Sequence, residues 1–126
     1  MKKEIKTNNA PSPIGPYSQA VLHNNMLFVS GQIAINSETN QLISNTIEEE
    51  THQVMKNIGA ILNEVNLEFS DIIKCSIFIK DMNQFSAINM IYGSYFTPPY
   101  PARETVEVSC LPKNVNVEIS VIAAKK

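Results

Sequence analysis

The sequence has few charged residues, and positive charge does not dominate among them. Asp, Glu, Lys and Arg make up 17% of the 126 residues, below the ~25% usual for soluble domains. Twelve acidic residues against ten basic ones give a formal net charge of −2. The basic surface that binds nucleic acid or anionic lipid is therefore missing, and we expect no nucleic-acid partner. No apolar run approaches the ~20 residues of a transmembrane helix, so we expect no membrane partner either.

Cysteine is also scarce, and its placement excludes the usual cysteine-based sites. Cys75 and Cys110 form no Cys-x-x-Cys motif, and His23 and His52 lie far from both in the sequence. This spacing argues against a zinc site and predicts two buried, reduced thiols. The first 13 residues lack the apolar segment of a signal peptide, so we expect a cytoplasmic protein. No nucleophile elbow, phosphate-binding loop, dinucleotide-binding motif or metal-ligand cluster is present.

The hydrophobic pattern changes its period along the chain and predicts both helices and strands. Apolar residues make up 44% of the sequence, enough for one domain that buries roughly two-thirds of the surface exposed by its unfolded chain. The pattern predicts helices at 47–66 and 83–96, and strands at 19–22, 26–30, 73–79, 106–110 and 115–121. The order β-β-α-β-α-β-β, without a repeat or linker, predicts a single α+β domain over residues 1–126.

Two turns in this pattern have residues suited to a defined local structure. Asn24 and Asn25 separate the first two strands, and Asn tolerates the left-handed conformation of a tight hairpin turn. Thr46 and Glu49 have the spacing of a capping box at the start of the first helix, where the acidic residues that follow also favour the positive end of the helix dipole.

Arginine occurs once, at Arg103, whereas the other nine basic residues are Lys. Arg103 follows a proline-rich loop and precedes a strand. A guanidinium group can bind a carboxylate or phosphate through two parallel hydrogen bonds, which an ammonium group cannot do. The residue is therefore either an ordinary surface Arg or an anion-binding group.

Three further positions interrupt the apolar pattern. Glu118 lies between Val117 and Ile119 in the last strand, either on a solvated face or, if covered, as a general acid or base with a raised pKa. Gly31 follows Ser30 at the end of an apolar strand, where glycine permits close approach of a ligand or forms a bulge. Tyr17 lies in the segment Gly15-Pro16-Tyr17-Ser18, where packing is the more common role.

Taken together, several short segments match one protein family in order and in spacing. They are Ile14–Ala20, Ser30–Ile33, Phe78–Asn83, Ile88–Asn89, Pro101–Arg103, Leu111–Lys113 and Val117–Ile119. The sequence resembles the RidA (reactive intermediate deaminase) family from about Ile5 to Ala124. Members of this family are also described as L-PSP endoribonucleases or translation inhibitors.

The resemblance implies a chorismate-mutase-like α+β fold, with a mixed sheet and two helices on one face. It further implies a homotrimer with clefts between the subunits, and no cofactor or metal. The implied reaction is the hydrolysis of 2-imino or enamine acids, such as 2-iminobutanoate, 2-iminopropanoate and 2-aminoacrylate, to 2-keto acids and ammonia. Such intermediates escape from pyridoxal-phosphate-dependent dehydratases, so the role would be metabolite damage control.

The resemblance also assigns roles to individual residues. Arg103 matches the arginine that binds the substrate carboxylate, and Glu118 matches the glutamate that positions or activates the attacking water. The positions that line the cleft match Tyr17, Ser30, Gly31 and Asn89, and Thr105 replaces a frequent cysteine whose backbone N–H faces the ligand.

The sequence departs from the family next to Arg103 and in the preceding loop. Glu104 stands where relatives commonly have Ser, and it would compete with substrate if it reached the guanidinium. Neighbouring side chains in a strand point to opposite faces, so we expect Glu104 to face away. The loop Thr97–Tyr100 is shorter than in some members and could reshape the cleft mouth.

Two other functions are compatible with the resemblance. One is an endoribonuclease or translation inhibitor, against which the acidic composition and the single Arg argue. The other is a non-catalytic trimeric regulator or ligand sensor that keeps the carboxylate pocket without turnover.

Overall fold

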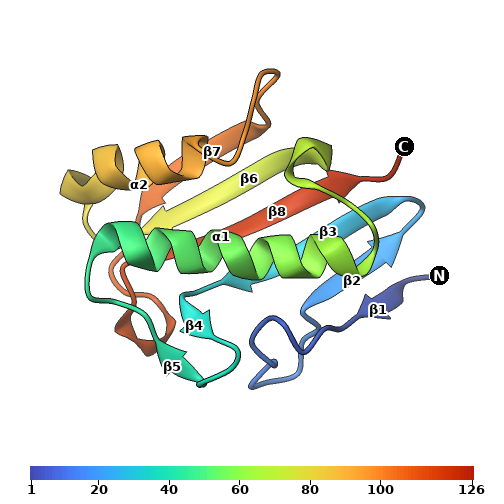
Figure 1. Ribbon diagram of the computed structural model, residues 1–126, viewed down its shortest axis with the longest axis horizontal. Coiled ribbons are helices and arrows are strands. Elements are labelled where there is room, and N and C mark those ends of the chain that lie inside the picture. Colours follow the sequence, from blue (N-terminus) through green and yellow to red (C-terminus); the bar gives the residue numbers. More distant parts are fainter.

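Six strands form one sheet, and two helices cover one of its faces (Figure 1). The elements are β1 (Lys3–Ile5), β2 (Ala20–His23), β3 (Met26–Gln32), α1 (Ile47–Glu64), β6 (Ile72–Ile79), α2 (Phe85–Gly93), β7 (Ala102–Glu107) and β8 (Val117–Ala124). The computed structural model describes residues 1–126, and the strand order is β1-β2-β3-β8-β6-β7. Only β6 and β7 are parallel neighbours. The predicted α+β fold, with a mixed sheet and both helices on one face, is therefore confirmed.

Helix α1 supplies much of the core. The Thr46 hydroxyl accepts a hydrogen bond from the N–H of Glu49 at 3.0 Å, so the Thr46 half of the predicted capping box forms. Fully buried side chains recur at helical spacing along the face toward the sheet, at Val54, Ile58, Ile61 and Leu62. Burying each such aliphatic side chain contributes about 1.5–3 kcal/mol. Neither helix combines the length and the apolarity needed to span a bilayer.

The strict alternation of β6 and β8 gives the sheet two different faces. On β6, Cys75, Ile77 and Ile79 are buried beneath the helices, and the intervening side chains point to the other side. The same alternation on β8 places Glu118 and Ser120 on that other side. We call the side without helices the open face. The single glutamate within β8 therefore belongs to the face that α1 and α2 leave uncovered.

The hairpin between β2 and β3 forms as the sequence predicted. Asn24 and Asn25 have φ angles of 49° and 68°, and His23 pairs with Met26 across the turn. Positive φ at both central residues is the backbone twist that suits a two-residue hairpin.

Three short strands escaped the sequence prediction, and one helix is shorter than expected. β1 and the separate hairpin of β4 (Ile35–Asn36) and β5 (Gln41–Leu42) contain only two or three residues each, too few for a periodic pattern. Helix α2 spans Phe85–Gly93 and not the predicted 83–96. It begins at Phe85 because the Asp81 carboxylate accepts the Asn83 N–H at 2.9 Å and starts a 3₁₀ turn instead.

Strand β7 lies earlier in the sequence than the predicted strand at 106–110, and this makes the prediction for one cysteine wrong. Its partner β6 ends at Ile79, which pairs with Glu107 and accepts the N–H of Val108, so the residues after Val108 have no strand beside them. Cys110 consequently lies off the sheet and is exposed, whereas Cys75 is buried as predicted. The two thiols are not bonded to each other.

Candidate active site

Glu118 occupies the open face at the end of the sheet where β8 begins and β3 ends. It pairs with Phe78 of β6, and its side chain is half-buried. This burial raises the pKa of the Glu118 carboxyl above its ordinary value, because desolvation disfavours the charged form. A carboxyl group with a raised pKa is a better general acid and base at neutral pH than an ordinary glutamate, because it both accepts and releases a proton more readily there.

The side chain of Glu118 lies directly against Gly31. A Cβ atom added to Gly31 would come within 2.5 Å of Oε2 and 2.7 Å of the carboxyl carbon of Glu118. The register of β3 against β8 also shifts between Val29 and Gln32. Gly31 has no positive φ, so the position requires glycine for space and not for backbone conformation. The bulge that the sequence suggested is thus present, and the group that approaches the glycine is Glu118.

Ser30 connects the end of β3 to the segment that carries Tyr17. Its hydroxyl donates a hydrogen bond to the carbonyl oxygen of Ser18 at 2.6 Å, and the Ser30 N–H donates to the carbonyl oxygen of Gln19. These bonds fix the Tyr17 backbone beside β3, and the Tyr17 side chain remains about half exposed at 52%.

The buried amide of Gln19 holds the proline-rich loop before β2 in place. Its Nε2 group donates to the carbonyl oxygens of Thr7, Ala10 and Pro11 at 3.0, 3.2 and 2.9 Å, and its Oε1 accepts the N–H of Thr7 at 2.7 Å. A loop rich in proline has few backbone donors of its own, so a side chain satisfies the carbonyls. Gln19 therefore fixes the loop that forms one wall of the cavity beside Glu118.

A cavity of about 450 Å³ opens beside Glu118, and we call it the Glu118 cavity. Its polar lining residues are Ser12, Gln19, Ser30, Gln32, Lys113 and Glu118, and the Tyr17 ring lies among them. The remaining wall is largely aliphatic, formed by Pro11, Ile14, Ile33, Ile35 and Pro112. One carboxyl and one ammonium group beside aliphatic side chains suit a small organic ligand.

Arg103 lies elsewhere, on the helix side of the edge strand β7. It pairs with the buried Cys75, and its Nη1 donates a hydrogen bond to Oδ1 of Asn89 in α2 at 2.6 Å. No carboxylate lies within ion-pair distance of the guanidinium, since the one ion pair in the structure joins Lys74 and Glu104. The guanidinium is thus oriented by a neutral amide and keeps donors free for an anion.

Two aromatic rings support the guanidinium of Arg103. Its central carbon lies 5.6 Å from the ring centre of Phe85 and 5.2 Å from that of Tyr92, within cation–π range. Burial and a hydrogen bond with the Cys75 thiol raise the pKa of Tyr92, so its hydroxyl stays protonated. The rings restrict the conformations of the long side chain, so the guanidinium is held in place.

A second cavity, of about 470 Å³, opens beside this cation, and we call it the Arg103 cavity. Its lining residues come from α2, the following loop and β7: Asn89, Tyr92, Gly93, Tyr100, Pro101 and Arg103. Thr105 lies two residues beyond Arg103 on the same side of β7. The hydroxyl oxygen of Thr105 is buried without a hydrogen-bond partner.

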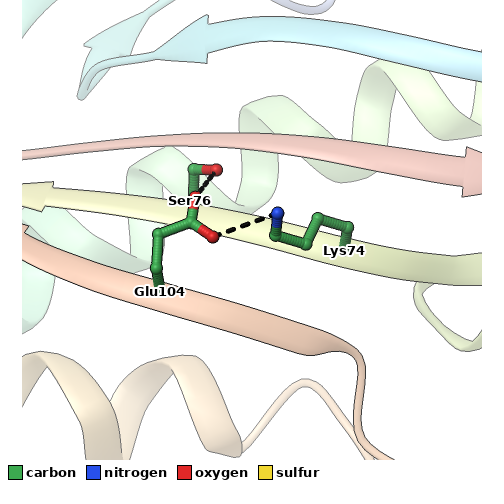
Figure 2. Close-up of polar contacts among 3 residues, drawn as sticks. All are labelled: Lys74, Ser76 and Glu104. Atoms are coloured by element: carbon green, nitrogen blue, oxygen red, sulfur yellow. Dashed lines mark hydrogen bonds and ion pairs between the residues drawn. The ribbon is translucent and has the colours of Figure 1, made fainter.

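Glu104 points to the opposite side from Arg103, as its place in the strand predicted. Figure 2 shows its carboxylate between Ser76 and Lys74 of β6: the Ser76 hydroxyl donates a short hydrogen bond to it, and Lys74 Nζ lies 3.1 Å from Oε1. The hydrogen bond from Ser76 and the contact with Lys74 hold the pKa of Glu104 below its ordinary value. Glu104 therefore does not compete for the guanidinium of Arg103.

The structure places the predicted site residues in two groups, which we call half-sites. The carboxyl half-site surrounds Glu118, and the cation half-site surrounds Arg103; strand β6 lies between the strands that carry them. The first group consists of Tyr17, Ser30, Gly31 and Glu118, and the second of Asn89, Arg103 and Thr105. Arg103 and Glu118 point to opposite faces of the sheet, so one chain does not bring them into one cavity.

The fold is that of an α+β domain with a mixed sheet, and comparison with known proteins shows its family. Residues 7–125 match the family model described as "Endoribonuclease L-PSP". The chain therefore belongs to this family, the one that the sequence motifs indicated under the name RidA.

Relatives and solved structures agree with this assignment. A RutC family protein of Pyrococcus horikoshii is 48% identical over 100% of both chains. The chloroplastic Reactive Intermediate Deaminase A of Arabidopsis thaliana is 42% identical over 98% of this chain and 66% of its own length. A crystal structure of Escherichia coli TdcF with bound serine has a TM-score of 0.94 and 38% identity, over 98% of this chain and 99% of that one.

Sequence reasoning missed the residues that hold the site together. Phe85 and Tyr92 carry an apolar signal that predicts only burial, and their contact with Arg103 depends on how α2 packs against β7. Gln19 lies within a recognised motif, yet its bonds to the proline-rich loop follow from the tertiary structure. The structure contains no cluster of three or more His, Cys, Asp or Glu side chains that could bind a metal ion.

Proposed function

We propose that this protein is a 2-imino acid deaminase that acts as a homotrimer. It would hydrolyse 2-iminobutanoate, 2-iminopropanoate and their enamine tautomers, such as 2-aminoacrylate, to 2-keto acids and ammonia. The observation that carries the proposal is the guanidinium of Arg103, which is oriented by Asn89 and two rings and has no carboxylate partner. Membership of a family that includes a named reactive intermediate deaminase supports the same reaction.

The proposed trimer follows from the separation of the two half-sites. In a cyclic trimer each interface joins two different surfaces of the chain, and the ring closes. The cation half-site of one subunit would thus meet the carboxyl half-site of the next. The open face supplies apolar contact area for this assembly, since Phe28 and Val106 there are 44% and 40% exposed, and large apolar side chains gathered on one face favour association.

In the joined cleft, each residue would have a distinct task. Arg103 binds the planar carboxylate of the imino acid through two hydrogen bonds, and Asn89 orients Arg103. The backbone N–H of Thr105 faces the reacting end of the substrate, and Tyr17, Ser30 and Gly31 enclose the reacting carbon near Glu118.

The reaction needs only water and proton transfers. Glu118 accepts a proton from the water as the water oxygen bonds to C2 of the imine, and it passes this proton to the imine nitrogen to give a carbinolamine. Glu118 then takes the proton of the carbinolamine hydroxyl and passes it to the amino group, the C–N bond breaks, and the keto group forms. Ammonia and a 2-keto acid leave, and the atoms balance with one water consumed.

The direct test supplies 2-iminobutanoate in situ from a threonine dehydratase and follows keto-acid release with purified protein. We expect release well above the spontaneous rate, and light scattering should give the mass of three chains. A rate equal to the spontaneous one would contradict the deaminase, and a monomer at assay concentration would contradict the shared cleft. Binding of 2-keto acids without turnover would instead indicate a ligand sensor or regulator.

The family name gives one specific reason to test RNA as well. The chain carries a net charge of −2, and a protein that binds the phosphate backbone normally presents a basic surface. We therefore expect no cleavage of RNA by nuclease-free preparations at low salt.

The unpaired Cys75 and Cys110 are consistent with a reducing, cytoplasmic location, which we include in the proposal.

Gly31→Ala tests the carboxyl half-site by displacing Glu118. The new methyl group would meet the carboxyl group of Glu118, a flexible side-chain end, so we expect little change in Tm. A displacement of about 1 Å costs on the order of 100-fold in rate, and we expect kcat to fall by that factor with little change in KM. An unchanged kcat would mean that the position of Glu118 is unimportant.

A further inference from the structure

Glu50 is the one carboxylate among the buried polar side chains of the fold. It lies in the first turn of α1 and is 1% exposed. No Lys or Arg pairs with it, since the structure has a single ion pair elsewhere. A buried carboxylate without a cation is costly unless hydrogen bonds satisfy it. Its partners therefore indicate what it does.

Both oxygens of Glu50 accept hydrogen bonds from one residue, Asn116. Oε2 accepts the backbone N–H of Asn116 at 2.8 Å, and Oε1 accepts its side-chain Nδ2–H at 2.8 Å. The carbonyl oxygen of Asn116 accepts the N–H of Lys80 at 3.0 Å. The backbone N–H, the carbonyl and the side chain of Asn116 are thus all held, directly before β8 begins.

The turn that leads into Asn116 is strained. Lys113 and Asn114 have φ angles of 55° and 56°, in the left-handed region that costs a non-glycine residue on the order of 1 kcal/mol. Pro112 and Lys113 also line the Glu118 cavity. Glu50 holds the far end of this turn through Asn116, and the ammonium group of Lys80 donates a hydrogen bond to Oδ1 of Asn114 within it.

We propose that Glu50 is a positioning residue which, through Asn116, sets the place of Glu118 and of the cavity wall at Pro112 and Lys113. The inference rests on the proposed role of Glu118. Asn116 and Glu118 are two residues apart in extended chain, about 6.6 Å, so a shift at the first passes to the second. Because Arg103 lies on β7, outside this turn, we expect carboxylate binding to change much less than turnover.

The test compares four variants by turnover. Glu50→Ala removes both hydrogen bonds, and we expect kcat to fall about 100-fold with KM within about threefold of wild type. Asn116→Ala removes only the side-chain bond and folds even if Glu50→Ala does not; we expect an intermediate fall. Glu50→Gln should retain most activity, since the Asn116 amide can turn to accept its N–H. Glu48→Ala, an exposed acid in the same turn of α1, is the matched control and should behave as wild type.

A second measurement needs no turnover. Titration of the Glu118 carboxyl by ¹³C NMR should show a lower pKa in Glu50→Ala and Asn116→Ala, because a looser turn admits water. The other titratable groups that line this cavity are Tyr17 and Lys113, and neither is altered in these variants.

The two measurements separate the possible failures. Wild-type kcat and an unchanged Glu118 titration in the folded variants would overturn the positioning role, as would a Glu50→Gln variant as slow as Glu50→Ala. If the wild-type protein has no deaminase activity but the variants still lower the pKa of Glu118, the proposed function is refuted and the effect of Glu50 on Glu118 is supported.

Discussion

Arg103→Lys is expected to lower kcat/KM for 2-iminobutanoate about 100-fold, by misplacing the substrate carboxylate. Lys keeps the positive charge but not the planar pair of donors that matches a carboxylate. It also loses the hydrogen bond to Asn89 and the contacts with the rings of Phe85 and Tyr92. The initial rate of keto-acid release over a range of substrate concentrations measures the effect, which should appear largely in KM.

Two companion variants separate the effect of the planar guanidinium group from the effect of positive charge alone and from the effect of the adjacent residue. Arg103→Ala should recover part of its activity when guanidinium ions are added, and less when ammonium ions are added. Glu104→Ser alters the adjacent residue, which bonds to Ser76 and Lys74 on the other side of the strand, and should stay within about twofold of wild type. Full activity of Arg103→Lys would show that Arg103 does not clamp the substrate. A large change in KM for Glu104→Ser would contradict its orientation.

Glu118→Gln is expected to lower kcat by about 10²–10⁴-fold, the usual contribution of general acid–base catalysis. The amide keeps the size of the side chain and its contact with Gly31 but no longer accepts a proton from water. Binding of a 2-keto acid product, measured by calorimetry, should remain near the wild-type value because Arg103 is unchanged. Turnover within threefold of wild type would assign the proton transfers to another group.

The raised pKa of Glu118 also predicts how the stability of this variant depends on pH. The folded-state pKa lies above the unfolded value, so the carboxyl contributes stability that is fully present below its unfolded pKa and is lost as pH rises through the folded pKa. At neutral pH the ionised, half-buried group therefore destabilises the fold. Glu118→Gln should have a higher Tm than wild type at pH 7 to 8, and the difference should shrink below about pH 4. A lower Tm at neutral pH would contradict this prediction.

The wild-type pH profile of activity follows from the same group. If Glu118 accepts the proton of the water, kcat/KM falls as pH drops through its raised pKa. Glu118→Gln should lose this acidic limb. Its persistence in the variant would assign the limb to another group.

The sequence predicted the elements with long periodic patterns and the residues with family counterparts. Helix α1, the β2–β3 turn at Asn24 and Asn25, and the outward direction of Glu104 all follow from local rules. The extent of β7 does not, because it depends on where its neighbour β6 ends at Ile79. The exposure of Cys110 was mispredicted for that reason.

Contacts between distant parts of the chain were also beyond the sequence. Glu50 resembles an ordinary acidic residue in the first turn of a helix, like Glu48 and Glu49, and only the fold brings it to Asn116, 66 residues away. Arg103 and Glu118 could each be singled out from the sequence. That they occupy opposite faces follows from the register of three strands, which no local pattern encodes.

The placement of the two half-sites on opposite faces has a genetic consequence. In the proposed trimer, each cleft takes its cation from one chain and its carboxyl group from the next. A chain with a defective Arg103 still offers an intact Glu118, and the reverse holds for a chain with a defective Glu118. Two inactive alleles expressed together would therefore complement each other, and random assembly from equal amounts would leave about one cleft in four intact. Activity therefore depends on each pair of neighbouring chains, because one chain can supply the half-site that the other has lost.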